Sequence, residues 1–333
     1  MKVGEFFCGA GGMGLGAKHA GFEHEFAIDY EFDAVATFSM NVSRNVLCAD
    51  IKEVDIEQLP YVDGFMYGFP CNDFSIVGSS EGLEGSFGGL YSYGVDYLNF
   101  HNPKFFVAEN VSGISAGGAL EIITDALAAA GNYGYELSVH KYKFEEYGVP
   151  QKRHRYVIVG MRSDLGLKFE VPEPLGRIVT AREALLDIPE WATNNERTKH
   201  PKLTVERLSY IKPGENVWQA DLPEHLKLKE QREDKQDSAM STRYRKTDPD
   251  KPAYTLTASG GGGTHGYHWE DRALTNRERA RFQTFPDSFK FVGGKESVRK
   301  QIGMAVPVLG AKIILEAVKK AFYRDAWTKG ILC

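Results

Sequence analysis

The chain begins with Val3-Gly4-Glu5-Phe6-Phe7-Cys8-Gly9-Ala10-Gly11-Gly12-Met13-Gly14, a short apolar run that leads directly into glycines. Such a run, bounded by turn residues, is typical of a buried strand. The glycines permit a tight turn and the close approach of a ligand to the backbone. Their spacing fits Gly-x-Gly-x-x-Gly, and Asp29 follows about 20 residues later, where an acid would meet a ribose hydroxyl. The stretch therefore indicates a nucleoside cofactor, and NAD, FAD and S-adenosylmethionine all remain compatible with it.

The first 160 residues alternate between strand-like and helix-like segments. Further strands are predicted at 26–28, 64–69, 105–108 and 156–160, and helices are predicted at 119–130 and 310–322. Strands that alternate with helices predict a parallel sheet covered on both faces. From about Pro172 to Gly266 the chain is rich in proline, glycine and charge, which favours a smaller, irregular domain. We therefore expect a first domain at 1–174, a second at 175–270, and a segment at 271–333 that returns to the first.

The composition is that of an ordinary globular protein, with 42% hydrophobic and 26% charged residues among 333. No run of about eighteen or more consecutive apolar residues occurs, so the sequence predicts no membrane span. The N-terminus reaches glycines too soon for a signal peptide. The spacing of the four cysteines predicts no metal site, and free thiols suit a cytoplasmic protein. The net charge is −5, so nucleic-acid binding would depend on local basic patches. Three patches lean basic: residues 141–162, residues 243–251, and Arg272, Arg277, Arg279 and Arg281.

Four segments place reactive side chains where ligands bind in open α/β folds. Cys71 lies in the segment 68–75 directly after a predicted strand, and Glu109 ends the next strong strand, so both should lie at the carboxyl edge of the sheet. The segment 151–155 contains Arg153 and Arg155, and the segment 301–307 precedes the last helix. Together they supply a nucleophile, an acid and two cations around one cleft.

With these segments the chain resembles the C5 DNA cytosine methyltransferases of bacterial restriction-modification systems. The matching stretches, in family order over nearly the whole chain, are 7–12, 68–75, 109–111, 151–155, 272–286 and 301–307. The resemblance implies a Rossmann-like, S-adenosylmethionine-dependent methyltransferase domain with a smaller target-recognition domain at 175–270. It also implies that the chain is a DNA (cytosine-5-)-methyltransferase.

The resemblance assigns a role to each matching residue. Cys71 would attack carbon 6 of cytosine, Glu109 would hold the N3 edge of the ring, and Arg155 would position the base. Pro70, Arg153 and Gln151 would shape or support the catalytic loop. The expected cofactor site, for S-adenosylmethionine, comprises Phe7, Gly9, Gly11, Gly12, Asp29, Tyr30, Asp50, Ile51, Met304 and Ala305. The family more often has Glu at the position of Asp29 and usually has Asn at the position of Met304.

The chemistry explains why these residue types are needed. Carbon 5 of cytosine is a poor nucleophile, and thiolate addition at carbon 6 makes it enamine-like. Because the reacting atoms are hidden in a duplex, the base must be flipped out. The glycine-rich stretch 78–94 could supply a loop that closes over it.

The implied partner is double-stranded DNA, for a monomeric enzyme that a restriction endonuclease could accompany. Candidate DNA contacts are Arg243, Arg245, Lys246, Thr255 and Gly261.

Three alternatives compete with this interpretation. A tRNA cytosine-5 methyltransferase would have the same catalytic core, but the long insertion, basic in places, favours DNA. A nicotinamide or flavin oxidoreductase would explain the glycine turn but would leave Cys71, Glu109 and the two arginines without a joint task. A DNA-binding protein without activity would not need Cys71 and Glu109 together.

Overall fold

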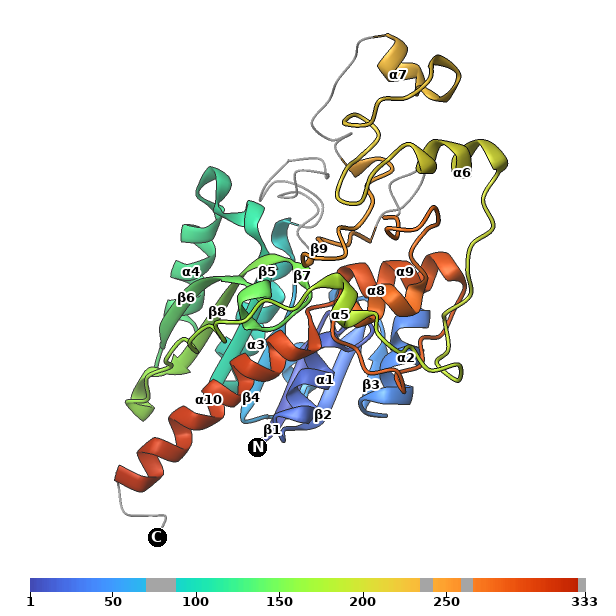
Figure 1. Ribbon diagram of the computed structural model, residues 1–333. Coiled ribbons are helices and arrows are strands. Elements are labelled where there is room, and N and C mark those ends of the chain that lie inside the picture. Colours follow the sequence, from blue (N-terminus) through green and yellow to red (C-terminus); the bar gives the residue numbers. More distant parts are fainter. Residues whose placement is uncertain (70–87, 234–241, 259–265, 329–333) are drawn as a thin grey trace.

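The computed structural model describes residues 1–69, 88–233, 242–258 and 266–328 (Figure 1). A sheet covered by helices forms one part of the molecule, and a smaller irregular part containing α6 and α7 rises from one end of it. The strands are β1 (Lys2–Phe6), β2 (Glu23–Asp29), β3 (Val46–Cys48), β4 (Gly64–Tyr67), β5 (Phe105–Val111), β6 (Tyr135–Lys143), β7 (Gln151–Lys152), β8 (His154–Arg162) and β9 (Ala253–Tyr254). The longer helices are α1 (Gly12–His19), α2 (Phe32–Asn41), α3 (Tyr91–His101), α4 (Ala119–Ala129), α6 (Lys202–Ser209), α8 (Asn276–Phe282), α9 (Lys295–Met304) and α10 (Val308–Thr328).

The central sheet has seven strands in the order β3-β2-β1-β4-β5-β8-β6. The first five pair in parallel, as the alternation of strands and helices predicts. Strand β8 departs from that prediction because it runs antiparallel to both β5 and β6. Strand β6 is not predicted from the sequence, because its residues are mostly half-buried or exposed and form no continuous apolar run.

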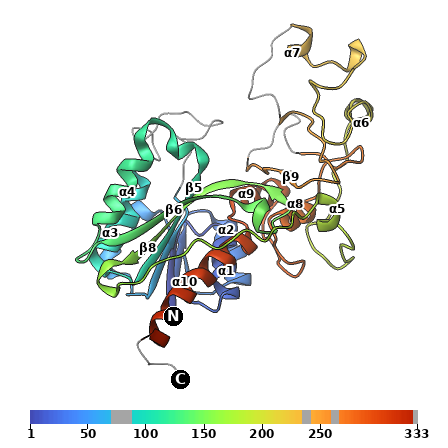
Figure 2. The ribbon, with the colours of Figure 1, turned by 60° about the vertical axis from the view of Figure 1, so that its left-hand side comes forward.

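Helices cover the two faces of the sheet, which Figure 2 shows nearly edge-on. Successive side chains of β5 point to opposite faces, as a strand requires. Phe105 and Val107 pack in a core with α1 and α10, whereas Phe106 and Ala108 pack in a second core with α3 and α4. Both faces are therefore buried, which explains why the parallel strands are continuous apolar runs.

The last residues of the loop predicted at 78–94 belong to helix α3 instead. The helix begins at Tyr91, and a Cβ atom at Gly94 would come within 2.4 Å of the Tyr67 ring. Gly94 therefore serves close packing of a helix on a strand. The part of that predicted loop before residue 88 lies outside the described residues.

The region 175–270 contains only short elements, including α5 (Ala181–Ala184), α7 (Lys229–Arg232) and β9. It has a small core of its own that includes Leu208, Val217 and Tyr267. Helix α8 then begins at Asn276, with Thr275 and Glu278 forming a capping box. The domain boundaries at 174 and 270 remain predictions.

One stretch, Lys295–Tyr323, is long and apolar enough by length and composition to cross a membrane. Of its most apolar window, 67% is buried inside the protein. It spans α9 and α10, and α10 packs against α1 in the core beside the sheet. This burial is that of a core helix in a globular domain.

Candidate active site

A cavity of about 280 Å³ lies at the carboxyl edge of the sheet. Its walls come from the glycine turn after β1, the end of β2, Glu109 of β5 and the helix α9. Ligands bind at this edge in open α/β folds. The residues that line it are Glu5, Phe7, Cys8, Gly9, Ala10, Gly12, Met13, Asp29, Tyr30, Glu31, Ala34, Gly68, Glu109, Ala258, Ser297, Lys300, Gln301, Met304, Ala305 and Val306.

The glycine turn is tightly constrained. Phe7 has a φ of 54° and Gly9 a φ of 52°, so the chain turns sharply as it leaves β1. The Gly9 amide then donates to Asp29 Oδ2 at 2.8 Å, which joins the turn to the end of β2. A Cβ atom at Gly12 would lie 2.2 Å from the carbonyl oxygen of Val306, so only glycine permits this approach to the segment before α10.

Asp29 is a buried acid that lines this cavity. Burial raises the pKa of its carboxyl, while hydrogen bonds from the backbone amides of Glu31 and Gly9 oppose that rise. Glu5 also lines the cavity, and burial raises its pKa against the opposing contact with His24. Two carboxyl groups with raised pKa values therefore lie at one end of the cavity.

Seven of the ten predicted cofactor residues line the cavity: Phe7, Gly9, Gly12, Asp29, Tyr30, Met304 and Ala305. Gly11, Asp50 and Ile51 do not. Gly11 contacts Phe38 and Val42 beneath the turn, Ile51 is buried in the core beside the sheet, and the Asp50 side chain caps a short helix at Lys52.

Glu31 and Lys300 form a pair that is not predicted from the sequence. These side chains form an ion pair at the rim of the cavity, joining the segment after β2 to α9. The two residues are separated by 269 positions, and nothing local in the sequence signals their contact. Ser297 and Gln301, on the same helix face as Lys300, also line the cavity.

Glu109 and Arg155 meet in an ion pair beside the cavity. Arg155 Nε lies 2.9 Å from Glu109 Oε1, and each side chain is only 12% exposed. The sheet register explains the contact, because Glu109 of β5 pairs with Val157 of β8 and Arg155 precedes Val157 by two residues. The two side chains are thus diagonal neighbours on one face.

Arg153 and Gln151 face inward, toward the segment 255–257. Arg153 donates to the carbonyl oxygens of Leu256 at 3.2 Å and Gly303 at 3.1 Å. Gln151 accepts from the Leu256 amide at 3.0 Å and donates to Phe282 O at 3.3 Å. Burial lowers the pKa of Arg153, with Arg155 as a second cause. Both residues therefore contact backbone groups, and neither lines the cavity.

Pro70 and Cys71 lie outside the described residues. The structure does describe Gly68 and Phe69, which directly precede them. Gly68 lines the cavity, and a Cβ atom on it would lie 3.4 Å from Glu109 Oε2. Asn110, which is buried, donates to the Phe69 carbonyl oxygen at 3.3 Å. The strand that precedes Cys71 therefore ends against the Glu109 carboxylate.

Four of the five candidate DNA contacts lie in the described residues, and each of these side chains contacts another group of the protein. Arg243 is paired with Glu230 at 2.8 Å, and Arg245 lies over the Tyr254 ring. Lys246 is 4% exposed and paired with Asp271 at 2.7 Å, so its charge is neutralised inside the protein. Thr255 donates to the Lys152 carbonyl oxygen. Gly261 lies outside the described residues.

The third basic patch is mostly internal. Arg272 is paired with Glu270 and Glu278, and Arg281 is paired with Asp287. Arg277 donates to three backbone carbonyl oxygens, those of Thr193, Pro286 and Phe289. These arginines therefore hold the segment 270–289 together, and the expectation of a basic surface there is wrong for them.

Solved methyltransferase structures share this fold. A prophage-encoded methyltransferase of E. coli matches with a TM-score of 0.75 and 22% identity, covering 97% of this chain and 99% of that one. The S. pombe Dnmt2 methyltransferase matches with a TM-score of 0.64 and 17% identity, covering 97% and 99% of the two chains.

Type II methyltransferases are more similar to this chain in sequence than these solved structures are. The type II methyltransferase M.BbvI of Brevibacillus brevis is 54% identical, over 97% of this chain and 92% of its own. M.NgoFVII of Neisseria gonorrhoeae is 38% identical, over 96% and 87%. The profile of the family described as C-5 cytosine-specific DNA methylase matches residues 1–320. The chain therefore belongs to the C-5 cytosine-specific DNA methylases.

Proposed function

We propose that the chain transfers a methyl group from S-adenosylmethionine to carbon 5 of a flipped-out cytosine in duplex DNA, through a covalent adduct on Cys71. The observation that carries this proposal is the Glu109–Arg155 ion pair at the edge of the cavity. The described end of the strand before Cys71 borders the same carboxylate at Gly68. Three peptide units separate Gly68 from Cys71, so their Cα atoms are at most about 11 Å apart.

The cavity suits S-adenosylmethionine. Its volume of about 280 Å³ approaches the usual size of small-ligand sites. Asp29 offers a buried acceptor for ribose hydroxyls, and Phe7 and Tyr30 offer aromatic surface for the adenine. Met304 and Ala305 form a less polar wall than the Asn that the family usually has at position 304. When bound, this cofactor supplies an electrophilic methyl group.

The residues of the chain would act on the cytosine in sequence. The Cys71 thiolate would add to carbon 6, and the ring electrons would then move to carbon 5. Carbon 5 would bond to the methyl carbon while the bond from that carbon to the sulfonium sulfur breaks, so that S-adenosylhomocysteine leaves. Glu109, held by Arg155, shares a proton with N3 as charge builds there. A base then removes the carbon 5 proton, the bond between sulfur and carbon 6 breaks, and the thiolate leaves the aromatic product.

The second region would recognise the DNA site. We assign target recognition to residues 175–270, between a catalytic domain at 1–174 and the returning segment at 271–333. Arg245 is the most suitable of the predicted contacts, since Arg243 and Lys246 are paired with carboxylates. The type II relatives support a role in restriction-modification beside an endonuclease. We further propose that the chain is a monomer and acts in the cytoplasm.

The decisive experiment is methyl transfer from labelled S-adenosylmethionine to duplex DNA and, in parallel, to tRNA. We expect label in DNA only, and bisulfite sequencing should then place every modified cytosine in one short sequence. Label in tRNA alone would favour the RNA methyltransferase with the same core. No label in either substrate, with cofactor still bound, would favour the DNA-binding protein without activity.

A further inference from the structure

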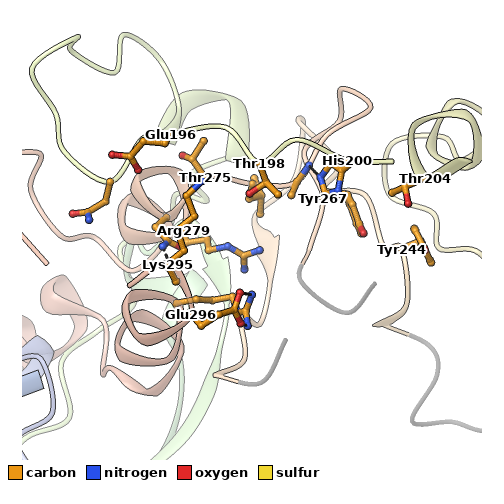
Figure 3. A pocket seen from close by; sticks show the side chains of 15 residues that line it. Glu196, Thr198, His200, Thr204, Tyr244, Tyr267, Thr275, Arg279, Lys295 and Glu296 are labelled. Carbon is orange, nitrogen blue, oxygen red and sulfur yellow. Dashed lines mark hydrogen bonds and ion pairs between the residues drawn. The ribbon is translucent and has the colours of Figure 1, made fainter. Parts of the chain in front are cut away.

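A second cavity, of about 380 Å³, lies between the segment 194–204, α8 and α9. It shares no lining residue with the cavity at the sheet edge. Helix α9 separates the two, because Ser297 and Lys300 line the first whereas Lys295 and Arg299 line the second. Figure 3 shows this second cavity, with α8 and α9 on one side and the 194–204 segment across from them. Nothing in the proposed reaction uses it.

Arg279 of α8 points into this cavity (Figure 3). The residue is 4% exposed. Among the described residues its guanidinium makes one hydrogen bond, from Nη2 to the Gly266 carbonyl oxygen at 3.3 Å, and no ion pair. Arg277, two positions earlier, instead donates to three carbonyl oxygens. A guanidinium has five N–H donors, so most of those on Arg279 remain available to a ligand.

Arg279 also keeps its charge. Burial lowers its pKa to about 10, which leaves it protonated at neutral pH. A buried cation without a counter-ion is costly, and a bound anion would remove that cost.

The charges around the cavity are arranged by depth. Arg279 and Arg299 are buried at its floor, whereas Glu196 and Glu296 are exposed at its rim. Glu296 is paired with Arg299 and so neutralises one of the two floor cations. Within the described residues, Arg279 is the buried cation of this cavity that no ion pair neutralises, and Lys295 is a further, exposed cation of its lining.

The first turn of α9 adds to the positive potential. The helix begins at Lys295, and its N-cap residue Gly294 provides no side-chain cap. Unsatisfied amides at such a terminus attract anions. The hydroxyl groups of Thr198 and Thr204 also line the cavity, and neither makes a side-chain hydrogen bond within the described ranges. The cavity thus offers a buried cation and two hydroxyl groups beside the first turn of α9, and such donors suit a phosphate group.

We propose that this cavity binds a phosphate group of the DNA backbone, with Arg279 as its buried cation. The inference rests on duplex DNA being the substrate. The cavity is formed by the region to which we assign target recognition and by the helices that join it to the sheet. A phosphate held there would fix the register of the duplex on the protein without reading its sequence.

The test compares matched variants in DNA binding. Arg279→Gln removes the charge, Arg279→Lys keeps it, and Arg177→Gln makes the same change at an exposed arginine elsewhere in the region. For Arg279→Gln we expect about tenfold weaker binding to a duplex that carries the target site. The slope of log K against log salt should also fall by about 0.9, the value of one phosphate contact. Arg279→Lys and Arg177→Gln should keep the wild-type slope.

A scan of the duplex compares the wild-type protein with Arg279→Gln position by position, so a uniform loss of affinity in the variant does not affect the result. In this scan neutral methylphosphonate replaces one phosphate of the duplex at a time. One position should weaken wild-type binding but leave binding to Arg279→Gln unchanged. An equal effect on both proteins at every position would overturn the inference.

The source of the phosphate is tested separately with inorganic phosphate. Saturable binding that Arg279→Gln abolishes, together with an unchanged DNA slope, would overturn the assignment to the DNA backbone. Methylation of the same duplex by the wild-type protein distinguishes the two proposals. If the wild-type protein methylates the duplex but the methylphosphonate scan affects both proteins equally, only this inference is contradicted. If the wild-type protein does not methylate the duplex, the proposed function is contradicted.

Discussion

The sheet and the region 175–270 are stabilised by different means. In the sheet, apolar side chains such as Phe105 and Phe106 alternate between two buried cores. In the second region the small core is supplemented by buried polar groups. Arg207 donates to Leu226 O and the Tyr244 hydroxyl, and Lys246 is paired with Asp271.

This difference fits the proposed division of the enzyme into a catalytic sheet edge and a DNA-recognising second region. A regular sheet places several side chains at one edge through register alone, as Glu109 and Arg155 illustrate. An irregular region held by long-range polar contacts can vary its surface without disturbing that edge. We therefore expect substitutions at the sheet edge to abolish chemistry and substitutions in the second region to alter stability or binding.

The largest effect should come from Cys71→Ala. Without the thiolate, carbon 5 stays unactivated, so methylation should be lost entirely while cofactor affinity is kept. Single-turnover transfer of label and calorimetric binding of S-adenosylmethionine measure the two. Cys48→Ala, at an exposed thiol on β3, is the control and should keep full activity. A Cys71→Ala variant at full rate would rule out the covalent route.

Glu109→Gln should lower kcat by about 10²–10³-fold, the usual contribution of a positioned acid–base group. The amide keeps the shape of the side chain but cannot share a proton with N3. Single-turnover kinetics at saturating DNA measure the chemical step directly. A loss confined to KM would mean that Glu109 only binds the base.

A smaller, pH-dependent effect is expected in the second region at His268. Burial lowers the pKa of His268 to about 4, so the unfolded chain takes up this proton first as pH falls. His268 should therefore contribute about 2 kcal/mol to the free energy of unfolding that is present at pH 7 and lost at pH 5.

His268→Asn should remove that pH-dependent difference, because asparagine does not titrate. Its side-chain oxygen could still accept the Glu270 amide that donates to His268. Urea unfolding of both proteins at the two pH values measures it. Parallel pH profiles for the two proteins would contradict a role for this buried histidine.

The smallest effect concerns cofactor affinity at Asp29. Since burial raises the pKa of this carboxyl, S-adenosylmethionine binding should weaken at a higher pH than the ordinary value of 3.8 would suggest. Protonation removes an acceptor for the ribose hydroxyls, so Kd should rise as pH falls. Asp29→Asn should bind about tenfold more weakly at pH 7 and lose this pH dependence. If Asp29→Asn keeps the wild-type profile, another group, such as Glu5, sets it.

The sequence predicts much of the sheet edge and little of the second region. Local spacing predicts the glycine turn and Asp29, and the end of a predicted strand gives the position of Glu109. The order of the strands in the sheet then brings these residues to one edge. The Glu31–Lys300 pair and the Arg279 cavity join residues far apart in the chain, and no local pattern signals such contacts. Strand β6 was missed because its residues are half exposed.

The basic clusters in the sequence do not show which arginines are exposed, for a related reason. A run of arginines predicts a charged surface only if its partners are solvent, and the partners of Arg272 and Arg281 are carboxylates brought in by folding. Charge patterning along a chain does not reveal such pairing.

In the proposed reaction the sulfur atom of Cys71 bonds to the cytosine ring during methyl transfer. The most direct measurement incubates the wild-type protein and S-adenosylmethionine with a duplex whose target cytosine carries fluorine at carbon 5, followed by denaturation and peptide mass spectrometry. Because fluorine cannot leave as a proton does, we expect a stable adduct on the peptide that contains Cys71. Turnover of the ordinary duplex without any adduct, or an adduct on another cysteine, would contradict the account.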